Sequence, residues 1–217
     1  MADAAIFLYD LTGRMAEPWA AAGYRCICVD VQHSIRRERV DGNISFVWGD
    51  VRTWRPPAGV RPVFVAAFPP CTHVAGSGAR DFATKGGMML RDALETFEAC
   101  RLAAAWSGAP YCIENPVGVL SSIPHIGKPD YRFHPSDYAG WLPPEERDAE
   151  AYTKLTCMWT GNGFVMPDRK PVAPTLGSMM HRLPPTEDRA DIRSATPRGF
   201  ARAVFEANAP VSRRAAA

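Results

Sequence analysis

The chain has 217 residues and a formal net charge of +2, and 47% of its residues are hydrophobic and 22% charged. This length is enough for one domain with a full core and a small appendage, and the fractions are those of an ordinary globular protein. No stretch approaches the length of a membrane span, and the charge is too small to argue for a nucleic-acid partner.

The first part of the chain predicts a βαβ unit. Residues 6–9 indicate a strand, 17–22 a short helix and 24–29 a second strand. The turn after the first strand contains Asp10 and Gly13 but no Gly-x-Gly-x-x-Gly, the pattern that cradles the phosphates of a dinucleotide. S-adenosylmethionine has no phosphate, so this turn favours a methyl donor over a dinucleotide. A simple strand-to-helix turn explains the stretch equally well.

Acidic residues follow the next two predicted strands. Asp30 ends the second strand and precedes Val31, and Asp50 and Val51 follow a third strand over 44–48. The first aspartate can accept hydrogen bonds from both ribose hydroxyls of a nucleoside, and the second can accept one from an adenine amino group. Taken singly, each is more often a helix cap or a loop residue. At successive strand ends they predict a nucleoside site.

A strand over 63–67 ends in Phe68-Pro69-Pro70-Cys71. The run is too short for a typical helix and is rich in β-branched and aromatic residues, which predicts a buried parallel strand. The two prolines end this strand and stiffen the place where the cysteine emerges. Because ligands bind at the carboxyl ends of such strands, Cys71 is a candidate nucleophile, although a free cysteine is more often a buried small hydrophobe.

A loop and a helix separate this strand from the next one. Residues 72–87 bear several glycines and predict a loop flexible enough to close over a substrate. Within it, His73 could act as a base, but a lone loop histidine is more often solvated. From 88 to 106 the apolar positions recur every three or four residues, which predicts a crossover helix between two parallel strands.

A second buried strand, over 110–113, ends in Glu114-Asn115-Pro116. Adjacent parallel strands end at the same edge of a sheet, so we expect the Glu114 carboxyl and the Cys71 thiol to lie there together.

The order and spacing of these two motifs resemble the nucleophile and acid motifs of the cytosine C5 methyltransferases, particularly their short phage-type members. The resemblance implies an α/β fold with a Rossmann-like doubly wound sheet of the class I methyltransferase type. It also implies that Cys71 and Glu114 are catalytic and lie across a gap the size of a pyrimidine. The contacts it implies are S-adenosylmethionine with Asp10, Gly13, Asp30, Val31, Asp50, Val51 and Pro69, and substrate with Pro70, Asn115, Arg132 and His134.

Residues 1–120 are thus expected to form the cofactor-binding and catalytic core, and 121–190 a small substrate-side insert. Within the insert, Arg132 and His134 could contact a base or a phosphate, or could pack at the surface. Residues 153–165 are β-like on both sides of a Gly-Asn-Gly turn and predict a β-hairpin.

The last part of the chain predicts a helix and a tail. Thr196 and Pro197 are typical of a helix cap and first helical residue, so 191–209 should contain a helix that returns to the core. Residues 210–217 are expected to be disordered.

The cysteines and the chain terminus favour a cytoplasmic protein. Several of the six cysteines lie in apolar runs, which favours free thiols, and they lack the spacing of a zinc site, so no metal is expected. The amino terminus is acidic where a signal peptide would be basic, and no membrane partner is expected. The basic cluster 36–39 is interrupted by a glutamate, and its default interpretation is a solvated surface.

Departures from the family bear on the substrate. There is no Gln-x-Arg-x-Arg after Glu114, and about forty residues between Trp159 and the last helix are too few for a large target-recognition domain. A free cytidine nucleotide, CMP or dCMP, is therefore slightly favoured over DNA of low sequence selectivity. Two other interpretations are a non-catalytic nucleotide-binding module and a cysteine hydrolase or thiol redox enzyme that uses Cys71 with His73.

Overall fold

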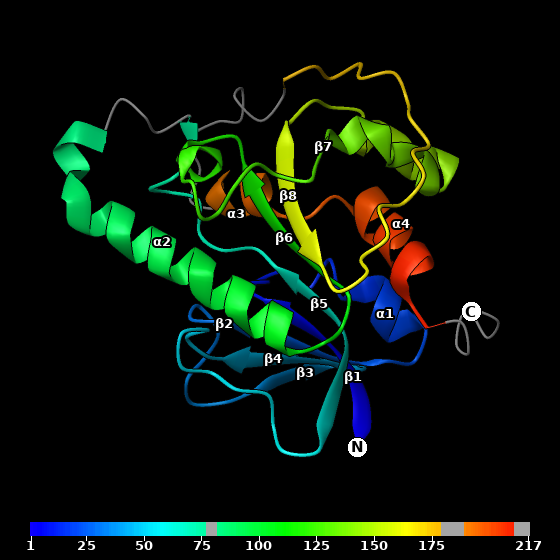
Figure 1. The fold of residues 1–217 in the computed structure, drawn as a ribbon. Helices are drawn as coiled ribbons and strands as arrows, with labels where there is room; N and C mark the ends of the chain where they lie inside the picture. The colour runs from blue at the N-terminus through cyan, green and yellow to red at the C-terminus, as the bar shows by residue number, and fades with distance from the viewer. Residues whose placement is uncertain (77–81, 179–188, 211–217) are drawn as a thin grey trace.

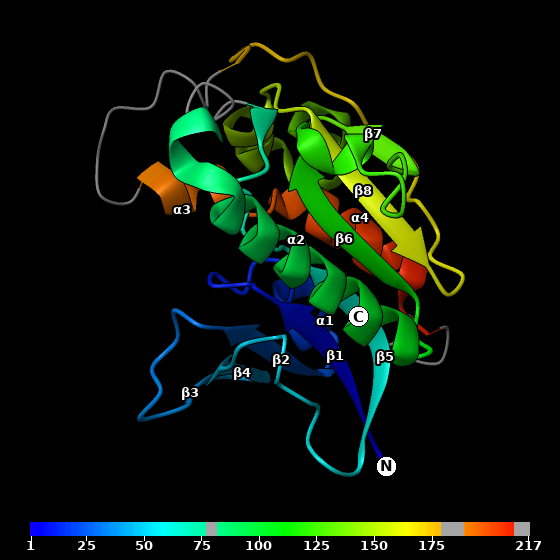
Figure 2. The same cartoon turned by 60° about the vertical axis from the view of Figure 1, so that its left-hand side comes forward.

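The computed structural model of the protein describes residues 1–76, 82–178 and 189–210. Within these residues, one twisted eight-stranded sheet has helices on both faces (Figures 1 and 2). The strands are β1 (Ala2–Leu8), β2 (Arg25–Asp30), β3 (Arg39–Asp41), β4 (Ile44–Trp48), β5 (Val60–Ala67), β6 (Tyr111–Pro116), β7 (Tyr131–Phe133) and β8 (Thr156–Gly161).

The sheet is mostly parallel, in the order β3-β4-β2-β1-β5-β6-β8-β7. The chain runs outward from β1 through β2 to β4, then returns to place β5 on the other side of β1. The strand order therefore reverses between β1 and β5, and ligands of open α/β sheets bind outside the carboxyl ends of the strands at such a point. The predicted mixed α/β fold is confirmed, and the arrangement is compatible with a Rossmann-like fold.

The antiparallel strands lie on the flanks of this sheet. β3 pairs with β4 at one edge, and β8 pairs with both β6 and β7 at the other. The sequence analysis did not predict β3, whose three residues are all exposed. A short exposed edge strand carries no apolar periodicity to reveal it.

Helices cover the two faces of the sheet unequally. The long α2 (Phe82–Trp106) crosses one face, whereas α1 (Glu17–Ala21) and α4 (Arg198–Asn208) lie on the other, and α3 (Arg189–Ser194) precedes α4 (Figure 1). Gly86 interrupts α2 with a φ of +73°, so its regular part begins close to the predicted start at residue 88. Short 3₁₀ turns occur at Val119–Ser122, Pro135–Asp137, Ala139–Trp141 and Pro144–Glu150. Of the helices in the described ranges, none is both long enough and apolar enough to cross a bilayer.

Aromatic side chains fill the core on both faces. Beneath α1 and α4, the Trp19 ring stacks on Phe64 with centroids 4.5 Å apart and meets Phe205 edge-on at 5.2 Å. Beneath α2, Phe97 meets Trp159 edge-on at 5.2 Å. Such pairs contribute beyond the area they bury, and they fix α1 against β5, α4 against α1, and α2 against β8.

The predicted hairpin over 153–165 does not form. β8 pairs with β6 and β7, and Phe164 and Val165 lie outside the strands. The reason is tertiary: the Phe164 ring packs 6.4 Å from the ring of Phe64, and the Val165 N–H donates to Asn208 Oδ1 at 2.8 Å. The core and α4 therefore hold this segment instead of a strand partner.

The expected division at residue 121 does not separate an insert from the sheet. Both β7 and β8 lie beyond it and extend the central sheet past β6. Residues 179–188 of the expected insert, 77–81 of the expected loop and 211–217 of the expected tail lie outside the described residues.

The amino end of α4 is capped by a residue remote in sequence. The Glu150 carboxylate accepts hydrogen bonds from the backbone N–H groups of Arg198 and Gly199, the second at 2.9 Å. Pro197 occupies the cap position, and Thr196, the predicted cap, makes no side-chain capping bond. Glu150 is the last residue of the 3₁₀ turn Pro144–Glu150, so these two bonds join that turn to the start of α4.

We expect Glu150→Ala to lower the free energy of unfolding by about 2–3 kcal/mol, because two N–H groups lose a charged acceptor. Thr196→Val removes the hydroxyl of the predicted cap and is expected to cost less than about 1 kcal/mol. Urea denaturation of the two variants measures both values. Equal losses would show that Glu150 is not the cap.

Candidate active site

Cys71 emerges from a turn that directly follows β5. The Phe68 N–H donates to Leu8 O at 2.8 Å, which keeps the chain beside β1 as it leaves the sheet. After Pro69 and Pro70, the N–H groups of Val74 and Ala75 donate back to Cys71 O at 3.1 and 2.9 Å. The half-buried Cys71 thus sits at the start of a hydrogen-bonded turn at the carboxyl edge of the sheet, where the sequence placed it.

An amide side chain joins this turn to β6. Asn115 Nδ2 donates to Pro69 O at 2.9 Å, and the Asn115 side chain is 1% exposed. Asn115 was expected to contact substrate. In the structure its amide instead fixes the position of Pro69, two residues before Cys71, relative to Glu114, the residue before Asn115.

Two backbone hydrogen bonds join the same segments further along. The Gly76 N–H donates to Val117 O and the Val119 N–H donates to Val74 O, both at 2.9 Å. Gly118 lies between them, so close to the turn that a Cβ built on it would stand 1.9 Å from Val74 O. A glycine at this position is therefore a steric requirement of the contact between the two segments.

The Glu114 side chain is 18% exposed and faces a cation. Lys154 Nζ lies 3.9 Å from Glu114 Oε1 and donates a hydrogen bond to Arg193 O at 2.8 Å. Burial raises the pKa of Glu114, and the Lys154 charge and the Thr156 hydroxyl oppose that rise without cancelling it. The site therefore favours the protonated carboxyl more than water does.

The Cys71 thiol and the Glu114 carboxyl influence each other. Burial raises the pKa of Cys71, the negative charge of Glu114 raises it further, and the cations of Lys154 and Arg193 lower it. The structure therefore brings the two predicted catalytic residues together, in a common electrostatic environment. It adds Lys154, which sequence analysis did not select; a lysine before β8 carries no local signal of a partner on β6.

The space beside Glu114 is small. A cavity of about 10 Å³ lies between Glu114, Phe68, Phe133, Phe200 and residues 194–197. This volume holds about one water molecule. Cys71 does not line this cavity, so its volume describes the space beside Glu114 and not the expected gap between the two groups.

Phe133 reaches this cavity, whereas the two residues expected at the substrate do not. Side chains alternate along a strand, so Phe133 points toward Glu114 and its neighbour Arg132 lies on the exposed side of β7. The Arg132 carbonyl accepts a bond from Arg169 Nη2 at 3.0 Å, and the His134 N–H donates to Asp137 Oδ2 at 2.8 Å. Both are backbone contacts at the sheet edge, two strands from β6, and neither Arg132 nor His134 lines the cavity.

On the cofactor side, Asp10 and Gly13 shape the turn after β1. Asp10 Oδ1 accepts bonds from the Gly13 N–H at 2.8 Å and the Thr12 hydroxyl at 3.1 Å. Gly13 has a φ of +72°, and a Cβ on it would stand 2.8 Å from the Phe46 ring. Asp10 Oδ2 is buried and has no partner in the described ranges, and burial raises the pKa of Asp10 to about 6. At neutral pH this is a buried carboxylate with an unused acceptor atom.

Asp30 and Val31 occupy the end of β2 as predicted. Asp30 is 3% exposed, and its Oδ1 accepts a bond from the Gln32 N–H at 2.8 Å. Val31 is 44% exposed. This valine presents an apolar surface at the edge where a nucleoside ring is expected.

Asp50 and Val51 are used differently. Asp50 Oδ2 pairs with Arg52 at 2.6 Å, and Arg52 also reaches Asp92 at 2.7 Å. Hydrogen bonding from Arg52 lowers the pKa of Asp50. Val51 is 2% exposed and belongs to the core. An adenine amino group would have to compete with Arg52 for Asp50, and Val51 has no surface to offer a ring.

His73 gives no sign of activating the thiol. Its Nδ1 is buried and makes no hydrogen bond with any group in the part of the chain that the structure describes. A hydrolase or redox site would need a base bonded to the Cys71 sulfur. The arrangement around Cys71 therefore favours Glu114 over His73 as its partner.

Replacing Lys154 by methionine should raise the pKa of Glu114 further, because the cation that lowers it is lost. A carbon-detected NMR titration of the Glu114 carboxyl measures the change. Lys170→Met is the matched control, since Lys170 lies over the Trp141 ring, 3.4 Å from its centroid. A Glu114 pKa that is the same in wild type and Lys154→Met would contradict the pairing.

All six cysteines are free thiols. Residues 1–76, 82–178 and 189–210 contain no group of three or more histidine, cysteine, aspartate or glutamate side chains placed to hold a metal ion. A scan against models of protein families and a search of curated proteins both find no match for this chain.

Proposed function

We propose that the protein is an S-adenosylmethionine-dependent methyltransferase that methylates carbon 5 of cytosine. The observation that carries the proposal is the hydrogen bond from Asn115 Nδ2 to Pro69 O, 2.9 Å long. It ties a thiol after one parallel strand to a carboxyl on the next, so that each influences the other's charge. Both motifs resemble those of the cytosine C5 methyltransferases, and their residues meet at one edge of the sheet.

The two groups suit the electronic demands of this reaction. Carbon 5 of cytosine is a poor nucleophile until a thiolate adds to carbon 6. As the Cys71 sulfur forms that bond, ring nitrogen 3 gains negative charge and takes a proton from Glu114. Nitrogen 3 of cytosine is an acceptor, whereas that of uracil is a donor, so a protonated Glu114 selects cytosine. The raised pKa of Glu114 supports this role.

The later steps return the site to its starting state. S-adenosylmethionine, when bound, would supply a methyl group on a sulfonium for carbon 5 to accept, and its sulfur would leave as a neutral thioether. A base then removes the carbon 5 proton, the bond between carbon 6 and the Cys71 sulfur breaks, and nitrogen 3 returns its proton to Glu114. Cys71 leaves as a thiolate.

Coupling between the two groups helps the first step. The charge of ionised Glu114 raises the pKa of Cys71, so a protonated Glu114 removes that contribution. When Glu114 is protonated it can act as the acid, and the pKa of Cys71 is lower, so the thiolate forms more easily. Lys154 and Arg193 favour the thiolate further.

The ends of β1 and β2 fit the methyl donor. The buried Asp10 carboxylate has an unpartnered oxygen within the described ranges, which suits the cationic amino acid end of S-adenosylmethionine. Asp30 suits ribose hydroxyls and Val31 offers an apolar surface to a ring.

One alternative has an observation in its favour. The cavity of about 10 Å³ beside Glu114 is too small for a pyrimidine ring, which favours a module that binds a nucleotide elsewhere and performs no chemistry on cytosine. A tritiated methyl donor offered with CMP, dCMP, single-stranded DNA and duplex DNA separates the two. We expect transfer to cytosine carbon 5 of at least one of these substrates. Donor binding by calorimetry without transfer would select the module, and neither binding nor transfer would overturn both.

A further inference from the structure

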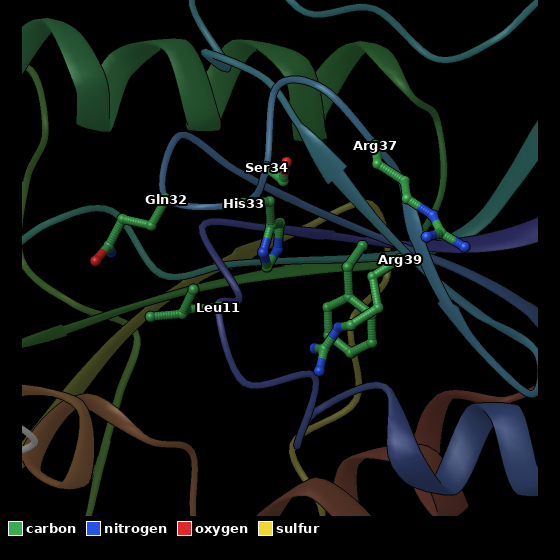
Figure 3. Close-up of a pocket in the computed structure, with 7 residues that line it drawn as sticks. Leu11, Gln32, His33, Ser34, Arg37 and Arg39 are labelled. Carbon is green, nitrogen blue, oxygen red and sulfur yellow. The ribbon is translucent and has the colours of Figure 1, made fainter.

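A second, larger cavity lies on the cofactor half of the sheet. It has a volume of about 360 Å³ and is bounded by the turn after β1, the loop between β2 and β3, and β4 (Figure 3). Leu11 and Phe46 supply apolar walls, and the loop supplies polar and charged side chains. Binding pockets commonly begin near this size. The cavity is outside the Cys71 and Glu114 site. It adjoins the ends of β1 and β2 proposed to hold the methyl donor, but Asp10, Asp30 and Val31 do not line it.

The charge in this cavity is of one sign. Arg37 and Arg39 line it, and no carboxylate does. Neither arginine forms an ion pair with any residue in the described part of the chain, unlike Arg52, Arg61 and Arg101, which all do. Two guanidinium groups on one cavity without counter-charges attract an anion.

One of the two arginines is also held in place. The Arg39 guanidinium carbon lies 3.7 Å from the centroid of the Phe46 ring, and the His33 ring meets the same phenyl edge-on at 5.4 Å. His33 Nε2 is buried and has no hydrogen-bond partner in residues 1–76, 82–178 or 189–210. The stack orients one guanidinium and reduces the entropy lost when it binds a ligand.

The donor set fits a phosphate group. Arginine binds phosphate oxygens through paired N–H groups, and the Gln32 amide and Ser34 hydroxyl on the same wall add neutral donors. A carboxylate ligand would use the arginines but would leave the other donors without oxygens to bind.

The position of the cavity identifies the kind of phosphate. Its residues come from β4 and from the loops after β1 and β2, whereas Glu114 lies on β6. β2 and β6 are three strand spacings apart, a distance of about 14 Å. One sugar separates the base and phosphate of a nucleotide, so a nucleotide whose base meets Glu114 cannot also place its own phosphate here. A neighbouring nucleotide of the same strand can.

We propose that the cavity lined by Arg37 and Arg39 binds a backbone phosphate of single-stranded nucleic acid, several nucleotides away from the cytosine that reacts. This inference rests on the proposed function, and it changes the preferred substrate from a free nucleotide to a short strand. A single strand is favoured over a duplex because its bases reach a site without the cost of unpairing.

The test is the affinity of the full chain for a short fluorescent oligodeoxycytidylate, measured by anisotropy over a range of salt concentrations. Arg37→Ala with Arg39→Ala should weaken binding about ten-fold or more and should reduce the slope of log affinity against log salt by about 0.7, the value for one phosphate contact on a single strand. Inorganic phosphate should compete with the strand in wild type but not in this variant.

Arg36→Ala is the matched control, because Arg36 belongs to the same loop but does not line the cavity. It should keep the wild-type slope. Arg37→Glu tests the same contact while it leaves the stack of Arg39 on Phe46 intact, so a folding defect in the double variant would not decide the result.

Each outcome of this test decides the proposal. Unchanged oligonucleotide affinity and slope in the double variant and in Arg37→Glu would overturn it. Equal losses for CMP and for the strand would also overturn it, because they would place the reacting nucleotide's own phosphate in the cavity. Binding needs no methyl transfer, so a chain that binds the strand through Arg37 and Arg39 but transfers no methyl group would reject the proposed function and keep this site.

Discussion

Glu114→Gln is expected to reduce methyl transfer to cytosine by about 10²–10⁴-fold, the contribution of a positioned general acid. Glutamine keeps the shape of the side chain and can still donate a hydrogen bond, but it cannot give a proton to nitrogen 3. Initial rates with a tritiated methyl donor at saturating nucleotide measure the loss. Glu98→Gln is the matched control, because Glu98 pairs with Arg101 at 2.5 Å on α2. Full activity in Glu114→Gln would rule out its role as acid.

The dependence of the methyl-transfer rate on pH should also report the protonation of Glu114. The reaction needs protonated Glu114, so the rate should fall as the pH rises through the pKa of that carboxyl. Burial raises this pKa, so the fall should lie above the usual range for a glutamate. Glu114→Gln should lack this limb of the profile, whatever activity it retains.

Gly118→Ala is expected to damage both stability and activity. Its Cβ would stand 1.9 Å from Val74 O, a backbone atom that cannot rotate away as a side chain could. The Cys71 turn and the segment after β6 must then move apart, which breaks the bonds from Gly76 N–H to Val117 O and from Val119 N–H to Val74 O. We expect the free energy of unfolding to fall by about 2–4 kcal/mol. A displacement of Cys71 by about 1 Å should lower the rate by about 10²-fold.

Gly87→Ala provides the matched control for this substitution. No atom lies within 4 Å of a Cβ built on Gly87, which is a helical residue of α2. Alanine there should leave the rate unchanged and keep or raise the free energy of unfolding, by up to about 1 kcal/mol. Urea denaturation and initial rates of both variants are the measurements. A Gly118→Ala protein as stable and active as Gly87→Ala would show that the two segments do not need their close approach.

The parts of the fold predicted from sequence are those with local signals. Apolar runs ended by turn residues located β2 and β4 close to their observed limits and the ends of β1 and β5, although β1 begins four residues and β5 three residues before the predicted start. The failures came from partners distant in the chain. Phe164 and Val165 looked like a strand, but Phe64 and Asn208 hold them elsewhere. Thr196 looked like a cap, but Glu150, 48 residues before the Arg198 N–H that it accepts from, takes that role.

The candidate site divides in the same way. Cys71 and Glu114 are close because they follow or end adjacent parallel strands, and apolar runs in the sequence are enough to predict those strands. The contacts of Lys154 with Glu114 and of Phe133 with the cavity depend on β8 and β7, whose pairing it does not show. Asp50 looked like a ligand contact because it follows a strand. The sequence does not reveal that Arg52 forms an ion pair with it.

The most direct test of the central claim is the intact mass of the protein after incubation with S-adenosylmethionine and a 5-fluorocytosine substrate, offered as a nucleotide and as a short strand. Fluorine blocks the loss of the carbon 5 proton, so the covalent intermediate should accumulate. The account predicts one adduct per chain, mapped by peptide analysis to Cys71 and absent in Cys71→Ala. Methyl transfer to ordinary cytosine without any such adduct, or an adduct on another cysteine, would contradict it.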